Sequence, residues 1–406
     1  MTTRARALFA GLLLSCGCGR SAELTACNIA DASCQRDVYY AVVRLRGDGF
    51  DPFAGLPPIH TVSLAAYRAE LLRQDAAQQK ASQQTPKQQA VDPWNAALQL
   101  LGLVTPSVSA TQASVANNVE NVAAFFSSAT GEVTVIDRGG ARDDASDTEL
   151  LAHELVHAFQ ARERAGEAVS HSTDGYFASQ ALIEGEATLY EHLARAEIDQ
   201  IKPQSVLWDR YYGNWAASLR QNLGQEQSHF YAVSWFVYPL GGDYLTRAWL
   251  VGGNAAVRRL GTDFPTSELA LMTSFDHGRS PALAARDCQS AAPNDSYALA
   301  GHDRFGSMQL YGFLAGPNMD DAEAWATSLL WRNDEVWVYF DAGSMQASVS
   351  WRVHMADAAS ADRVVTAALA NPDAPLHARR EGNDALIYAA DDAGLIPDWL
   401  KPSECK

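Results

Sequence analysis

The sequence predicts an α+β protein with a mostly helical main body, one strand beside it and a small α+β domain towards the C-terminus. Two helical patterns follow each other in the middle of the chain, at residues 146–164 and 174–200. Residues 132–137 alternate as a strand before them, and residues 335–340 and 347–354 alternate as two paired strands after them. Since 47% of the 406 residues are hydrophobic, the chain can bury a core in more than one domain.

The segments before the middle helices have weaker patterns. Residues 37–46 fit a strand or a helix, and residues 64–74 fit a short helix with Ser63 as its N-cap. Residues 117–126 fit a helix. Residues 74–92 are rich in Gln, Ala and Lys, which is typical of an exposed linker or a frayed helix end.

The first of the middle helices should begin at Ser146, because Ser146 and Glu149 fit a capping box. Residues 230–251 are strongly apolar, but Pro, Asp and Arg interrupt them, so a pair of buried helices is expected there rather than a membrane span. A helix around residues 361–370 follows the C-terminal strands. The tryptophans of the C-terminal part are expected in the core: Trp325, Trp331, Trp337 and Trp351.

These patterns divide the chain into four parts. We expect a signal peptide at residues 1–15, followed by an N-terminal segment with the Gln-rich linker at residues 16–92. The main domain covers residues 93–285, and the C-terminal α+β domain covers residues 286–406.

The first residues have the features of a secretory signal. Two arginines precede an apolar run at residues 7–14, which is too short to span a bilayer. Residues 13–16, LLSC, resemble the lipobox at which bacterial lipoproteins are cleaved and acylated, here on Cys16. Cys18 is the alternative acylation site, and an ordinary cleaved signal is the alternative to acylation. We therefore expect an exported protein of the cell envelope, anchored to a membrane by a lipid.

Export places the remaining cysteines in an oxidising compartment, where an even number suggests disulfide bonds. They are Cys27, Cys34, Cys288 and Cys405. Three pairings exist for four cysteines, and we favour Cys27–Cys34 with Cys288–Cys405. Four zinc-binding thiolates are the alternative, but the closely spaced pairs of a zinc ribbon are missing from the sequence.

The strongest chemical signal lies in residues 151–160, LAHELVHAFQ. His153 and His157 are four residues apart, so on an α-helix both imidazoles share a face and can reach one ion. Glu154 lies about 100° further round the helix, beside the ion, where it can hold a water as general base. Burying three such groups without a metal would be costly. The pattern therefore predicts zinc at His153 and His157.

Zinc catalysis needs a third protein ligand and an open fourth position. Residues 181–191 read ALIEGEATLYE, and here the sequence resembles the gluzincins, the zinc peptidases that include thermolysin and the alanyl-type aminopeptidases. In the aminopeptidases a Glu-Gly-x-Ala element carries the ligand glutamate. The matching residues imply Glu184 as the third ligand, with Glu186 as its rival. The small Gly185 and Ala187 would allow the two helices to pack closely.

The resemblance is incomplete. The Gly-x-Met-Glu-Asn element of the aminopeptidases is missing, so aminopeptidase activity is not implied. Thermolysin-like enzymes have an aspartate where this chain has Thr188. Glu191, seven residues after Glu184, is the candidate to support a zinc-binding histidine instead. A broader resemblance to uncharacterised prokaryotic zincin-like proteins covers about residues 42–370, and residues 265–268, PTSE, would be the counterpart of their Pro-Thr-Ser-x-Glu element.

Two further groups are candidates by the same resemblance. Gluzincins use a Tyr or a His to hydrogen-bond the developing oxyanion, which makes Tyr231 and His229 candidates; core packing is the alternative for Tyr231. His171 and His192 are expected to be surface or capping histidines rather than zinc ligands.

The resemblance implies a zincin-like core in which residues 132–137 form an edge strand that binds an extended substrate by backbone pairing. We expect zinc-dependent hydrolysis of a peptide or protein, with Glu154 taking a proton from the attacking water. The alternatives are a non-catalytic zincin-fold lipoprotein that binds an envelope partner, and a zincin that hydrolyses a non-peptide amide. The net charge of −17 repels phosphate backbones, so no nucleic-acid partner is expected.

Overall fold

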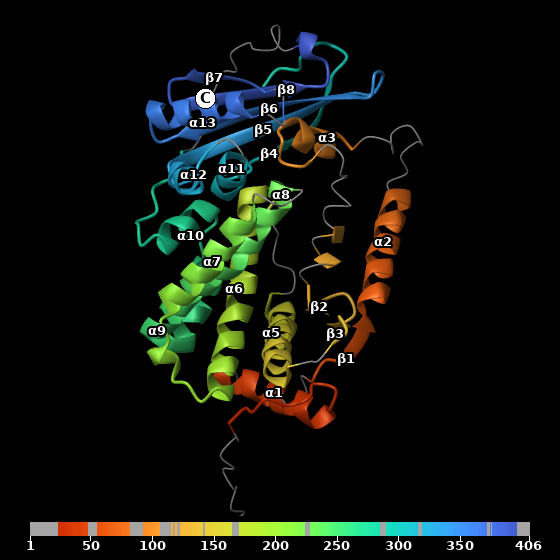
Figure 1. The fold of residues 1–406 in the computed structure, drawn as a ribbon, viewed down its shortest axis with the longest axis vertical. Coiled ribbons are helices and arrows are strands. Elements are labelled where there is room, and N and C mark those ends of the chain that lie inside the picture. Colours follow the sequence, from red (N-terminus) through yellow and green to blue (C-terminus); the bar gives the residue numbers. More distant parts are fainter. Residues whose placement is uncertain are drawn as a thin grey trace, which may run out of the picture.

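The fold combines a helical body, a small sheet beside it and a larger sheet at one end (Figure 1). This mixture confirms the predicted α+β class. A computed structural model describes residues 23–47, 55–81, 92–105, 115–116, 118–119, 122–140, 143–164, 170–223, 228–284, 290–315, 319–371, 374 and 376–395. The predicted acylation sites Cys16 and Cys18, and the predicted pair Cys288–Cys405, lie outside these residues.

The small sheet has the strand order β1-β3-β2, in which β3 is parallel to β1 and antiparallel to β2. Its strands are β1 Ile59–Ser63, β2 Ala124–Ser127 and β3 Glu132–Asp137. The predicted strand at residues 132–137 is therefore present, but the prediction that it is an edge strand is wrong. It pairs with a neighbour on both sides, and β2 is the edge strand on the other side of the sheet from β1. The helix predicted at residues 117–126 is also wrong where β2 forms, because Phe125 and Phe126 pair with β3.

Helices cover this sheet on both sides (Figure 1). Helix α2, Leu64–Ala81, continues directly from β1, and Ser63 Oγ accepts a hydrogen bond from Ala66 N at 3.2 Å. On the other side lies α5, Asp144–Glu163. Val133 and Val135 of β3 are buried in the same core as the apolar residues of α5. The sheet thus lies along the helix that carries the two histidines.

The start of α5 differs from the predicted capping box. The Asp143 carboxylate accepts hydrogen bonds from Ala145 N and Ser146 N, both at 3.3 Å, and Ser146 Oγ donates to it at 2.6 Å. Asp143 is therefore the N-cap, and Ser146 lies in the first turn. The helix thus begins three residues earlier than predicted, because the Asp143 carboxylate accepts from the free N–H groups of its first turn.

The helical body continues with α6, Thr173–Ile198, α7, Trp208–Leu223, and α9, Val237–Asp263. Residues 230–251 form α8, His229–Ala232, the 3-10 helix η3, Val233–Phe236, and the first part of α9. No helix among the described residues is both long enough and apolar enough to cross a membrane. Other described helices before the large sheet are α1 Ala32–Arg46, α3 Pro93–Leu100, η2 Pro203–Ser205 and α10 Glu268–Phe275.

Helices α6 and α9 cross with their backbones in contact. A Cβ atom on Gly185 would lie 2.3 Å from the Gly241 carbonyl carbon, and one on Gly241 would lie 1.9 Å from Ala181 O. Gly185 was expected to let the two middle helices pack closely. The close approach instead joins α6 to α9, since glycine is the residue that permits such backbone contact.

The large sheet has five antiparallel-paired strands in the order β4-β5-β6-β8-β7. They are β4 Ala298–Asp303, β5 Trp331–Asp341, β6 Gln346–Met355, β7 His377–Glu381 and β8 Asp384–Ala390. The helices around it are α11 Ser307–Leu314, α12 Asp321–Ser328, α13 Ala358–Ala370 and η4 Ala393–Leu395. The predicted strand pair and the helix after it are confirmed, and all four tryptophans expected in the core are buried.

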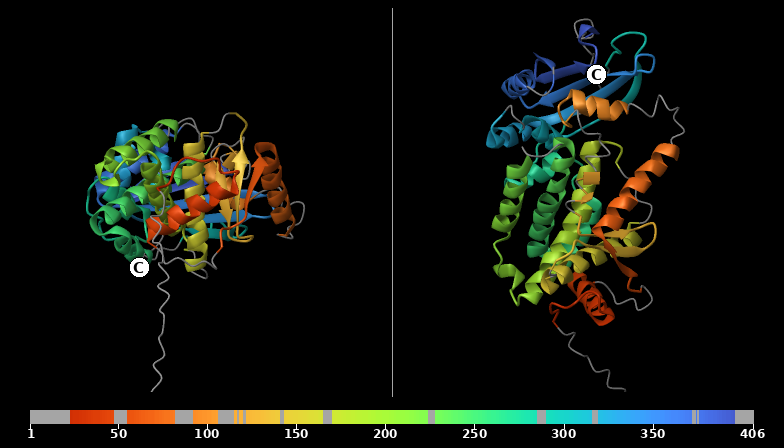
Figure 2. Two further views of the ribbon diagram at one scale, coloured as in Figure 1. Left: turned by 90° about the horizontal axis from the view of Figure 1, so that it is seen from below. Right: turned by 45° about the vertical axis from the view of Figure 1, so that its right-hand side comes forward.

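The sheet and the helical body share one hydrophobic core, which includes residues of α3, η3, α11 and the inner face of β5 and β6. Helix α3 precedes the whole helical body in the chain, yet it packs against the large sheet (Figures 1 and 2). At the junction the side chains of Asp174, Glu268 and Asp334 are buried. Glu268 Oε2 has no hydrogen-bond partner among the described residues. Burial, and then the nearby Asp174, raise the pKa of Glu268 well above its usual value.

A disulfide bond joins Cys27 to Cys34, as predicted. It closes the start of α1, whose Val38 and Val42 are fully buried in the core shared with α5. Thr148 Oγ1 of α5 donates to Cys27 O at 3.1 Å, and Cys27 N donates back to Thr148 Oγ1 at the same distance. The disulfide loop is thus attached to the first turns of the histidine helix.

Candidate metal centre

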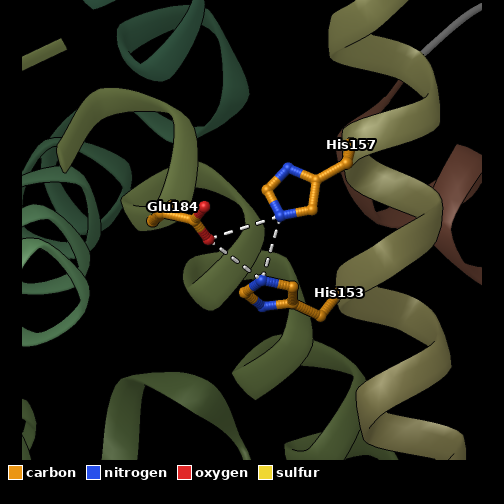
Figure 3. A group of neighbouring side chains, drawn as sticks. All are labelled: His153, His157 and Glu184. Atoms are coloured by element: carbon orange, nitrogen blue, oxygen red, sulfur yellow. Dashed lines mark hydrogen bonds and ion pairs between the residues drawn. The ribbon is translucent and has the colours of Figure 1, made fainter. Parts of the chain in front are cut away.

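Helices α5 and α6 lie side by side and carry the three predicted zinc ligands. His153 and His157 are four residues apart on α5 and point from one face of that helix towards Glu184 on α6 (Figure 3). Ser172 caps α6 by accepting a hydrogen bond from Gly175 N at 3.2 Å. The apolar side chains of both helices, including Leu151, are buried in one core.

The ligand atoms converge on one point. His153 Nε2 and His157 Nε2 are 3.1 Å apart, and Glu184 Oε2 lies 3.3 Å from each of them (Figure 3). Zinc holds nitrogen and oxygen ligands at about 2.0–2.1 Å in a tetrahedron, which separates neighbouring ligand atoms by about 3.3 Å. The spacing of this donor set therefore fits a tetrahedral zinc ion.

The outer nitrogens of both imidazoles face hydrogen-bond acceptors. His153 Nδ1 lies 2.8 Å from Glu191 Oε2, and His157 Nδ1 lies 2.8 Å from Gln160 Oε1. The orientation of the Gln160 amide is set by its Nε2, which donates to Ile183 O at 2.9 Å and to Glu186 Oε2 at 3.0 Å. With a metal ion bound, both histidines would therefore carry a proton on Nδ1 and present the Nε2 lone pair to the ion.

The two Nε2 atoms are 3.1 Å apart, so lone pairs on both would repel each other unless a proton or a metal ion lay between them. Burial lowers the pKa of His153, but Glu191 and Glu184 outweigh this effect and hold the pKa well above its usual value. The surroundings therefore stabilise a positive charge at this point, whether a proton or a metal ion carries it. The residues fit zinc in number, type and spacing.

Glu154 lies next to this group and is not part of it. Its side chain is 4% exposed, and its Oε2 has no hydrogen-bond partner among the described residues. Burial raises the pKa of its carboxyl group, opposed by the two histidines. A buried carboxylate oxygen without a partner is costly, and Glu154 lines a cleft in which a hydrogen-bond donor such as a water can reach it.

The two candidate glutamates on α6, Glu184 and Glu186, contact different side chains. Glu184 faces the histidines, whereas the Glu186 carboxylate interacts with Gln160 and with Arg46 Nη2 at 3.2 Å. Glu191 lies against His153, in the position for which it was the candidate. Thr188 is fully buried away from solvent.

The other histidines lie elsewhere. His171 is exposed. His192 approaches Glu149 and Glu191 closely enough to suggest a second metal group. Both of its ring nitrogens, however, lie at hydrogen-bond distance from tyrosine hydroxyls, Tyr212 at 3.1 Å and Tyr211 at 3.0 Å. Burial lowers its pKa to about 4, so His192 is a neutral, hydrogen-bonded core residue.

Tyr238, which the sequence reasoning missed, lies closer to the ligands than the two predicted oxyanion donors. Its ring stacks on His153 with centroids 6.1 Å apart. Burial, followed by the Glu184 carboxylate with which it interacts, raises its pKa well above the usual value, so the hydroxyl keeps its proton. Tyr231 lines a neighbouring cavity, and His229 lines neither of the two cavities at the site.

Gln160 was also missed, although it follows His157 by three residues and therefore lies on the same face of the helix. That spacing was the available signal. For Tyr238 no spacing rule exists, because α9 meets α5 and α6 only through the tertiary fold.

A cleft of about 440 Å³ opens at the group formed by His153, His157 and Glu184. Residues Ala124–Phe126 of the edge strand β2 line one side, and His153, Glu154, His157 and Glu184 line the other.

Comparisons with protein-family models, with curated proteins and with solved structures find no match to this chain. The interpretation of the site therefore depends on its own geometry.

Proposed function

We propose that this chain is a zinc metallopeptidase of the gluzincin type, with a zincin-like core formed by α5, α6 and the small sheet. The observation that carries the proposal is the convergence of two histidine Nε2 atoms, 3.1 Å apart, with a carboxylate oxygen 3.3 Å from both. His153, His157 and Glu184 would hold the ion. When bound there, zinc would polarise a carbonyl group and lower the pKa of water.

Glu154 has the environment of a general base. It is buried and lines the cleft beside the ligands, and its Oε2 lacks a partner among the described residues. It would accept a proton from the attacking water and then donate that proton to the leaving amine. A site that only stabilises the fold would need no such group and would close its fourth ligand position.

Tyr238 would supply a hydrogen bond to the carbonyl oxygen as negative charge develops on it. Its raised pKa keeps the hydroxyl protonated, and stacking on His153 holds the ring beside the ligands. Donors that are already in place before the reaction contribute strongly because nothing has to reorganise.

The edge strand β2 supports a peptide as the substrate. Among the described strands β2 pairs only with β3, and its residues line the cleft. An extended peptide can add to such an edge by backbone hydrogen bonds, which would align it across the metal position.

The test compares wild type with Glu154→Gln on a broad peptide library. We expect both proteins to bind one zinc per chain, and we expect turnover to fall by about two to four orders of magnitude in the variant. Contaminating proteases would not respond to this substitution. If wild type cleaves nothing, or if the variant cleaves equally well, the proposal is wrong, and a non-catalytic protein that binds an envelope partner becomes the better account.

We further propose that the chain is exported and anchored through Cys16, with Cys18 as the alternative. The Cys27–Cys34 disulfide supports an oxidising compartment. In a bacterium that processes lipoproteins, the wild type should incorporate labelled fatty acid and sediment with membranes, and the Cys16→Ser, Cys18→Ser variant should do neither. Equal partitioning of both proteins would leave only a simple signal peptide.

A further inference from the structure

A second cavity, of about 340 Å³, adjoins the metal position on the side of α9. It shares Gln180, Glu184 and Tyr238 with the cleft that runs along β2. A group bound at the metal would therefore have the β2 cleft on one side and this cavity on the other.

The cavity lies between two helical stripes. Tyr176, Gln180 and Glu184 recur every four residues on α6 and so share one face of that helix. Tyr231 and Tyr238 face them from α8 and α9, at the two ends of a segment that also contributes η3. Both stripes end at the metal position, in Glu184 and Tyr238.

The lining is mainly aromatic. Its ring-bearing residues are Tyr176, Phe177, Tyr231, Trp235 and Tyr238. Val237 adds an aliphatic surface, and the other described lining residues are the uncharged polar Asn118, Gln180 and Ser234 together with Glu184. Trp235 and Tyr238 stack with centroids 5.5 Å apart, which holds this wall in a defined shape. Tyr176 is 41% exposed, so it lies at the mouth of the cavity.

These lining residues indicate which kind of side chain the cavity would bind. Aromatic side chains in the wall of a pocket bind apolar groups and bury a large area against them. Among the described residues that line the cavity, only Glu184 is charged, and its charge would be used to bind the metal. An acidic or basic side chain would lose its hydration without gaining an ion pair of its own.

We propose that this cavity is a specificity subsite that binds an aromatic or large aliphatic side chain of the residue flanking the scissile bond. The inference rests on the proposed peptidase function, because the subsite is defined by its position beside the metal. The β2 cleft would then hold the rest of the peptide backbone, and the cavity would decide where the chain is cut.

The test uses the zinc-loaded protein and peptides that differ only at positions flanking one bond. At one of these positions, Phe, Tyr or Leu should give a kcat/KM about ten- to a hundredfold higher than Ala or Asp, the range expected for burying one such side chain. Tyr231→Ala and Tyr176→Ala should reduce this ratio several-fold. Tyr176 is the safer site for folding because it is exposed. Tyr40→Ala, which removes a tyrosine of similar exposure from α1, should leave the ratio unchanged.

A binding measurement separates the subsite from catalysis. The zinc-loaded Glu154→Gln variant should bind a benzyl-substituted hydroxamate at least tenfold more tightly than a methyl-substituted one, and Tyr231→Ala in that background should reduce the difference. Peptide cleavage without this preference, or a preference that both cavity variants retain in full, would overturn the subsite and leave the peptidase intact. A protein that binds no zinc and cleaves no peptide would overturn the proposed function and the subsite with it.

Discussion

Gln160 tests how His157 is held in position for zinc. Its side chain contacts His157 at Nδ1 and not at Nε2, the nitrogen that would bind the ion. Its Oε1 accepts from His157 Nδ1 at 2.8 Å, and its Nε2 donates to Ile183 O and Glu186 Oε2. Gln160→Met keeps the length and approximate volume of the side chain and removes all three hydrogen bonds. His157 would then be free to carry its proton on either nitrogen and to rotate.

The magnitude follows from these contacts. Loss of a hydrogen bond to a metal-binding histidine lowers metal affinity by about ten- to a hundredfold, which equals about 1.4–2.7 kcal/mol of binding free energy. The metal-free protein should also lose about 0.5–1.5 kcal/mol of unfolding free energy, because the hydrogen bond from Gln160 Nε2 to Ile183 O is lost. Glu186 keeps its ion pair with Arg46 and should contribute less.

Zinc affinity is measured by competition with a chromophoric chelator, and stability by urea unfolding of the metal-free protein. The matched control is Gln180→Met, which makes the same substitution in the same cleft, on α6. We expect the control to keep wild-type zinc affinity. Wild-type affinity in Gln160→Met, or equal losses in both variants, would refute the role assigned to Gln160.

Three further predictions concern other parts of the molecule. Glu184→Ala should lose zinc in metal analysis, and Glu186→Ala should retain it; the reverse result would show that the wrong glutamate was assigned. Tyr238→Phe should keep both zinc and the ring that stacks on His153, but its kcat on a cleaved peptide should fall by about 10²–10³-fold, the usual loss for one oxyanion donor; an unchanged kcat would exclude the role. The raised pKa of Glu268 means that the folded protein retains a proton that the unfolded chain loses above the ordinary glutamate pKa. The stability associated with this proton is complete below that value and is lost by about 1.4 kcal/mol per pH unit as the pH rises towards the folded pKa. Glu268→Gln should therefore gain stability relative to wild type between pH 5 and pH 8 in urea unfolding, and parallel pH curves would contradict a buried acidic group.

Local patterns predicted much of the secondary structure. The 3.6-residue period identified α5 and α6 within a few residues, and the alternation at β5 and β6 identified a true strand pair. Errors occurred where neighbours in space decide the outcome. Phe125 and Phe126 form a strand because β3 is there to pair with them. Strand β3 is central because β1, more than sixty residues earlier, adds to its other side in parallel.

For the site, the sequence alone determined that His153 and His157 share a face, because helical geometry depends only on their spacing. It also placed a carboxylate, Glu154, next to them. Only the tertiary structure decided which side chains complete the group. The Gln160 amide is oriented by its hydrogen bond to Ile183 O on α6. Tyr238 of α9 lies beside the site because Gly185 and Gly241 allow α6 and α9 to pack in contact. Such contacts join residues that are far apart in the chain, so the periodicity of a single segment cannot predict them. They depend on how all the helices and strands pack together.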